Sequence, residues 1–80
     1  MLLSDAVIGQ SCSVVNLNLP AELSHRLEAL GMTHQSRLQI LNRKGHGILI
    51  IRLRGTRYAL GYNITSHIEV TPCEGERHGR

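Results

Sequence analysis

The chain has 80 residues, a formal net charge of +3 at pH 7, 41% hydrophobic residues and only 2% aromatic residues. A chain of this length buries one core, which excludes two independent domains and a large enzyme fold. The two aromatic residues are tyrosines, so the core must be built from leucine, isoleucine and valine.

The first part of the chain predicts one strand and one helix. Residues 12–17 are β-prone and predict a short first strand. Asn18 as a capping residue and Pro20 in the first turn predict a helix start. The helix is supported by leucines at i, i+4 and i+7, namely Leu23, Leu27 and Leu30. Gly31 is expected to end it with a positive φ, and Met32 to supply the hydrophobic contact just beyond.

The next segments predict a three-stranded meander. Residues 37–42 alternate, with Leu38 and Ile40 on one face. A glycine-containing loop over residues 43–47 predicts a hairpin into a strand over residues 48–54. That strand has three inward residues, Leu49, Ile51 and Leu53. A tight turn at Gly55-Thr56 then leads into a strand over residues 57–62, in which Tyr58, Leu60 and Tyr62 share a face.

The last structured segments are a turn and a closing strand. Residues 63–66 have the chemistry of a single 3₁₀ turn, and residues 67–71 predict a final strand that Pro72 ends. The fold class is therefore mostly β. We predict a small SH3-like five-stranded antiparallel barrel with one α-helix inserted between strands 1 and 2, because closure removes unpaired edges. A split sheet is the alternative. Residues 1–73 form this domain, and residues 74–80, which lack apolar side chains, form a disordered tail.

Membrane insertion and secretion are not expected. The longest apolar run, residues 48–51, falls far short of the ~20 residues that span a bilayer. The first residues lack the basic and apolar regions of a signal peptide, which predicts a cytoplasmic protein.

Cys12 and Cys73 match no CxxC pattern and are expected to be reduced in the cytoplasm. If the first and last strands pair antiparallel, Cys12 and Cys73 come close, so a thiol pair is one hypothesis. Two separate thiols are the other.

Histidines and acids do not form a recognisable site. No two of the five histidines stand at the spacing of metal ligands on one element; they are His25, His34, His46, His67 and His78. We assign no metal ligand and no cofactor, and leave open only weak binding of Fe²⁺ or another divalent transition metal. No nucleophile elbow, phosphate loop or acid pair is present, so the chain is not expected to be an enzyme.

Basic residues concentrate in the predicted hairpins, as Arg43, Lys44, Arg52, Arg54 and Arg57. This cluster has three interpretations. It could meet an acidic surface of a partner protein. It could meet nucleic acid, although it lacks aromatic side chains that stack on bases. It could also be a solvated face that protects the strands from aggregation.

Several motifs resemble the ferrous iron transport protein A (FeoA) family. They are Leu27-Glu28-Ala29-Leu30-Gly31-Met32-Thr33, Leu38-Gln39-Ile40-Leu41, Arg54-Gly55-Thr56-Arg57-Tyr58-Ala59-Leu60 and Ile68-Glu69-Val70. The resemblance covers nearly all of residues 5–71. It implies a cytoplasmic SH3-like domain that accompanies a membrane ferrous-iron permease carrying a GTP-binding domain. A related domain is fused to iron-dependent repressors. The chain departs from the family at His34-Gln35, where Pro-Gly is usual, and in its shorter 44–47 hairpin.

The resemblance implies an accessory or regulatory protein that binds the cytoplasmic GTP-binding part of the permease, without nucleic acid or membrane insertion. We expect the contact surface to combine an apolar anchor with basic residues, namely Met32, Arg43, Lys44, Arg52, Arg54 and Arg57. The alternative function is a metal-responsive SH3-like regulatory module that binds transition metal directly or works with a repressor.

Overall fold

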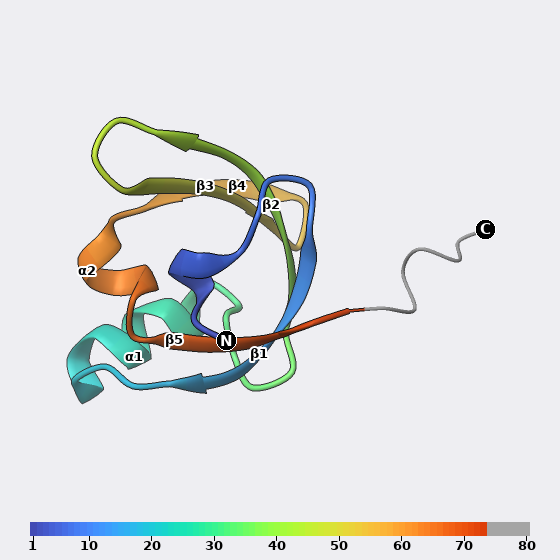
Figure 1. Cartoon of the computed structure of the whole chain (residues 1–80). Helices are drawn as coiled ribbons and strands as arrows, with labels where there is room; N and C mark the ends of the chain where they lie inside the picture. Colours follow the sequence, from blue (N-terminus) through green and yellow to red (C-terminus); the bar gives the residue numbers. More distant parts are fainter. Residues whose placement is uncertain (74–80) are drawn as a thin grey trace.

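The computed structural model describes residues 1–73 (Figure 1). Its elements in chain order are the 3₁₀ helix η1 (Leu3–Asp5), β1 (Ser11–Leu17), α1 (Ala21–Ala29), β2 (Arg37–Lys44), β3 (Ile48–Leu53), β4 (Thr56–Leu60), α2 (Tyr62–Thr65) and β5 (Ile68–Pro72). The tail predicted to be disordered, residues 74–80, lies outside the described residues.

The five strands form one antiparallel sheet in the order β4-β3-β2-β1-β5. The sheet curls, so that β1 and β5 lie opposite β3 and β4, with η1 between the two layers (Figure 1). The single longer helix, α1, connects β1 to β2. This architecture confirms the predicted SH3-like fold class.

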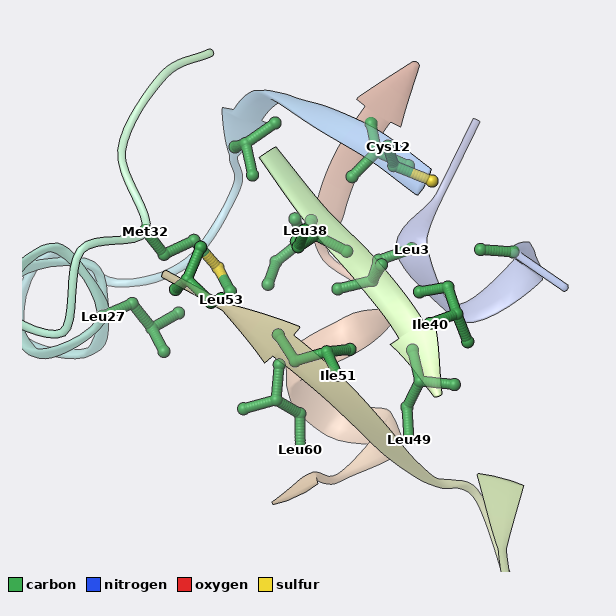
Figure 2. Close-up of a cluster of buried hydrophobic side chains, with 14 residues drawn as sticks. Leu3, Cys12, Leu27, Met32, Leu38, Ile40, Leu49, Ile51, Leu53 and Leu60 are labelled. Carbon is green, nitrogen blue, oxygen red and sulfur yellow. The ribbon is translucent and has the colours of Figure 1, made fainter. Parts of the chain in front are cut away.

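The core is aliphatic, as the composition requires. Inward residues of β2 and β3 meet those of β1 and β5, and α1 and η1 cover the ends (Figure 2). The buried hydrophobic residues are Leu3, Ala6, Cys12, Val14, Leu27, Met32, Leu38, Ile40, Leu49, Ile51, Leu53, Leu60, Ile68 and Val70. The predicted inward residues of β3 are therefore confirmed.

The N-terminal segment is an element that the sequence patterns did not predict. Leu3, the first residue of η1, and Ala6, which follows η1, are fully buried. Ahead of η1 the backbone lies along β5: Leu2 bridges Glu69, and the Val70 N–H donates to the Met1 carbonyl at 2.7 Å. The Met1 ammonium in turn donates to the Val70 carbonyl at 2.9 Å. This segment therefore covers the free edge of β5.

Helix α1 begins later than predicted and ends as predicted. Pro20, not Asn18, occupies the N-cap position. Asn18 makes other hydrogen bonds: its N–H donates to the His67 carbonyl, and its Oδ1 accepts from the Asn16 Nδ2. At the other end Gly31 has φ +106°, and its N–H donates to the Glu28 carbonyl at 2.9 Å. The Met32 N–H donates to the Leu27 carbonyl at 3.0 Å, which completes a Schellman motif.

Four details of the second half differ from prediction. Strand β5 includes Pro72, which pairs with Cys12, whereas Pro72 was expected to lie just beyond the strand. The second hairpin turns at Arg54-Gly55 instead of Gly55-Thr56, since both residues have positive φ and Leu53 pairs with Thr56. Residues 62–65 form a short α-helix in place of a 3₁₀ turn. Tyr62 therefore leaves the sheet and is 61% exposed, so it does not share a buried face with Leu60.

Candidate functional site

A β-bulge decides which basic side chains share a face. In β2 the register shifts between Ile40 and Asn42, so Leu41 is the extra residue. Arg43 consequently pairs with Leu49, which is buried, and takes the inner face of the sheet. Its guanidinium donates to the Ser4 carbonyl at 2.9 Å and also to the Ala6 carbonyl. Arg43 therefore anchors the N-terminal segment and does not belong to the predicted basic surface.

Arg52 and Arg57 form the centre of the observed basic surface. They are direct cross-strand partners on β3 and β4, and both are exposed. The two-residue turn makes this a non-hydrogen-bonded pair, in which Cα atoms lie roughly 4.5 Å apart. Like charges in such a pair repel each other and reduce stability. An anion bound beside them would remove this repulsion.

Arg54 extends the same surface toward the end of α1. It sits in the turn with φ +54°, a conformation that few non-glycine residues adopt. Its side chain crosses Gly31: a Cβ on Gly31 would lie 2.5 Å from the Arg54 Cδ. The guanidinium is thus held near the C-terminal end of α1, where the helix dipole favours positive charge. We call Arg52, Arg54 and Arg57 the arginine hairpin.

A groove of about 220 Å³ lies beside the arginine hairpin. Its lining comes from β1, β2, β3 and the β3–β4 turn. The lining residues are Ser11, Arg37, Leu38, Gln39, Arg52, Arg54 and Gly55. Sequence reasoning missed Arg37 and Gln39 as part of this surface. The signal was present, because their alternation with the inward Leu38 and Ile40 places both on the outer face.

Two other residues of the predicted contact surface lie elsewhere. Met32 is 2% exposed and contacts the core, because the Schellman motif turns it inward beside Leu27. It cannot serve as an exposed apolar anchor, which corrects the prediction. Lys44 pairs with Ile48 at the far end of β3, four residues from Arg52, and this separation corresponds to roughly 13 Å along the strand.

Within residues 1–73, no group of three or more histidine, cysteine or acidic side chains gathers at a distance suited to a metal ion. His34 is the one histidine with a side-chain hydrogen bond in this part of the chain, between its Nδ1 and the Val15 carbonyl at 2.8 Å. The structure therefore adds no candidate ligand set to the sequence analysis. His78 lies outside the described residues.

The two cysteines lie on neighbouring positions but on opposite faces. Strands β1 and β5 pair antiparallel as expected, with Cys12 opposite Pro72. Cys12 is fully buried, whereas the Sγ of Cys73 lies 3.1 Å from the Ser13 Oγ on the outer side. Both thiols are free. The predicted proximity is confirmed, but the two sulfurs do not form a pair.

The chemistry of Cys12 follows from its burial. Burial raises the pKa of the Cys12 thiol above its ordinary 9.0, and the nearby Cys73 adds to this increase while the N-terminal ammonium opposes it. Because folding raises the pKa of Cys12, the neutral thiol contributes fully to the stability of the fold at pH values below the pKa it has in the unfolded chain. This contribution to stability is lost as the pH rises through the higher pKa of the folded state.

We predict two clearly different rates of thiol modification. At pH 8 and in native buffer, the half-buried Cys73 should react with a disulfide reagent such as DTNB first, and Cys12 only at the rate at which the fold opens. The measurement is the time course of thiolate release. Cys73→Ser should remove the fast phase and Cys12→Ser the slow one; two equal fast phases in the native protein would contradict the burial of Cys12.

The fold and surface together define a class of protein. This is a small SH3-like barrel that carries three arginines on one hairpin. The FeoA domain family model matches residues 1–72, and the chain belongs to that family. The family consists of small non-catalytic accessory proteins, which confirms that the chain is not an enzyme. No helix within residues 1–73 has the length and hydropathy needed to cross a membrane.

Solved structures that share this fold include the following three proteins. An iron uptake regulatory protein (FeoA) is 26% identical, with 91% of this chain and 96% of that chain covered and a TM-score of 0.80. FeoA of Stenotrophomonas maltophilia, solved with zinc, is 24% identical over 89% of each chain with a TM-score of 0.77; it is described as a candidate ferrous iron transport activating factor. A manganese-dependent transcriptional repressor is 19% identical, with 91% of this chain but 41% of that chain covered and a TM-score of 0.82. No curated protein matches the chain.

Proposed function

We propose that the chain is an accessory protein of ferrous iron uptake in the cytoplasm, and that it acts by binding the GTP-binding part of a ferrous-iron permease through the arginine hairpin. Membership of the FeoA domain family supports the process, and the iron uptake regulatory protein with the same fold supports a regulatory role. The single observation that carries the contact surface is the exposed Arg52–Arg57 pair.

The chemistry of this surface favours an acidic protein over a nucleic acid. Guanidinium groups are weakly hydrated and bind carboxylates through two parallel hydrogen bonds. None of the described residues that line the groove is aromatic, so the groove has no ring on which a base could stack. Exposed arginines that face a carboxylate-rich surface accelerate encounter and set the orientation of the complex.

Reversing one charge tests this proposal. Arg57→Glu should weaken binding to the purified GTP-binding part of the permease by about tenfold at low salt, because a carboxylate would then face the acidic partner. The melting temperature should stay the same or rise, since an Arg52–Glu pair replaces two like charges. Isothermal titration calorimetry and thermal unfolding give both values.

Lys44→Glu is the matched control, since it changes the charge equally but at the far end of β3. It should leave the Kd nearly unchanged. Equal weakening by Lys44→Glu and Arg57→Glu would mean that overall net charge, and not the arginine hairpin, governs binding. Stoichiometric metal retained by the purified protein after dialysis would instead favour a metal-responsive module.

A further inference from the structure

The two edges of the sheet differ in whether another segment of the chain covers them. The edge of β5 is covered by the N-terminal segment, through the hydrogen bonds of Met1 with Val70 and the bridge between Leu2 and Glu69. At the other edge, β4 pairs with β3 alone. Within residues 1–73, no further backbone hydrogen bond reaches Arg57 or Ala59. One edge is therefore closed by the chain itself, and the other is open.

The register identifies the backbone groups that are free at this edge. The two-residue turn is closed by Leu53 and Thr56, which form a hydrogen-bonded pair in this type of hairpin. Hydrogen-bonded and non-hydrogen-bonded pairs then alternate along an antiparallel ladder. Arg57 and Ala59 fall on the non-hydrogen-bonded positions, so their N–H and C=O groups point away from β3. These four groups match the hydrogen-bonding pattern of one added strand.

The positive charges beside this edge favour the addition of a negatively charged strand. Arg57 lies on the edge strand itself, Arg52 lies directly behind it on the outer face, and Arg54 stands at the turn. A second copy of the chain would bring a second set of these arginines close to this one, which is unfavourable. An extended segment with carboxylates at every second position would place them all on the arginine side.

We infer that the β4 edge binds an extended acidic segment of a partner protein by strand addition. Main-chain hydrogen bonds to Arg57 and Ala59 give this contact its geometry, and the arginine hairpin gives it its charge preference. The inference rests on the proposed function in that the permease is the expected source of the segment. It specifies the contact further, because it assigns a role to backbone groups that a purely electrostatic contact would not use.

The opposing explanation is that the arginines only protect an exposed edge from aggregation, as charged residues on edge strands often do. One charge on the edge strand suffices for that purpose. Here three arginines occur within the six residues 52–57, two of them repel each other, and the third adopts a left-handed backbone conformation. Such departures from favourable local structure are typical of functional surfaces.

Ala59→Pro separates the backbone contribution from the charge. Proline removes the N–H that points away from β3 and leaves the β3–β4 ladder intact, and proline is tolerated at such edge positions. Ala59→Ser is the matched control, because it keeps the N–H. Two ligands are used: the GTP-binding part of the permease, and a blocked peptide Glu-Val-Glu-Val-Glu-Val-Glu, with Lys in place of Glu as its control.

We expect Ala59→Pro to weaken binding of both ligands by about tenfold or more, and Ala59→Ser to bind like the wild type. In the wild-type protein, the Glu peptide should slow hydrogen exchange of the Arg57 and Ala59 amides, measured by NMR, and the Lys peptide should not. This exchange measurement uses the unaltered protein, so it decides the question even if Ala59→Pro fails to fold.

The outcomes distinguish the inference from the proposed function. If the permease part binds the wild type and Ala59→Pro equally well but binds Arg57→Glu poorly, electrostatic docking stands and strand addition is overturned. If the permease part does not bind at all but the Glu peptide protects both amides, the proposed partner is wrong and strand addition stands. If the Glu peptide leaves the exchange of both amides unchanged, strand addition is overturned in either case.

Discussion

Ile51→Ala should lower the free energy of unfolding by about 2 to 5 kcal/mol. Ile51 is fully buried at the middle of β3 (Figure 2). It pairs with Ile40 on β2 and with Tyr58 on β4. Alanine would leave a cavity that the surrounding side chains fill only in part, because they are held in place on the strands of the sheet. A domain of 80 residues has a total stability of about 4 to 12 kcal/mol, so the loss is a large share of it.

Urea unfolding followed by circular dichroism measures this effect, and Ile48→Ala is its matched control. Ile48 belongs to the same strand and has the same side chain, but it is 37% exposed on the outer face. Its replacement should cost clearly less, about 1 to 1.5 kcal/mol, because more than a third of the side chain is already exposed to water in the folded protein. Equal losses for Ile51→Ala and Ile48→Ala would contradict the assignment of the inner face.

Gly31→Ala should cost about 1 to 3 kcal/mol and should also displace the side chain of Arg54. Gly31 has φ +106°, which is unfavourable for any residue with a Cβ, and the Schellman motif depends on this conformation. The added Cβ would lie 2.5 Å from the Arg54 Cδ, so the arginine must move away from the end of α1. A single methyl group should therefore reduce both stability and, to a smaller extent, partner binding.

Gly9→Ala separates the cost of the positive φ from the cost of the contact with Arg54. Gly9 has a similar φ of +92°, but nothing lies within 4 Å of an added Cβ, so only the backbone cost applies. Thermal unfolding of Gly9→Ala, Gly31→Ala, Arg54→Ala and the Gly31→Ala/Arg54→Ala double variant completes the comparison. If Gly31→Ala has the same effect with and without Arg54, the contact between them has no energetic role.

The sequence predicted the parts of the fold in which a simple period continues without interruption. The inward residues of β3, Leu49, Ile51 and Leu53, alternate without a bulge, and the structure buries all of them. Gly31 could be assigned because the glycine at a helix end has one common conformation. Pairing of the first and last strands followed from the expected barrel and is confirmed.

The remaining features depend on tertiary contacts that no local pattern contains. The bulge at Leu41 leaves no sign in the sequence, yet it moves Arg43 to the inner face, where it contacts the backbone of η1. Helix η1 is three residues long and is held by burial of Leu3, not by helix propensity. Met32 could be predicted as the contact beyond Gly31, but the same contact buries it, which is incompatible with a role as a surface anchor.

The central claim is that the arginine hairpin binds the GTP-binding part of a ferrous-iron permease. The most direct test is calorimetric titration of the purified wild-type protein against that part, at low and at physiological salt, with and without nucleotide. We predict saturable binding whose Kd rises with salt, since exposed charges are screened over a Debye length of about 8 Å at physiological ionic strength. Absence of binding in every condition, or a Kd that does not change with salt, would contradict the claim.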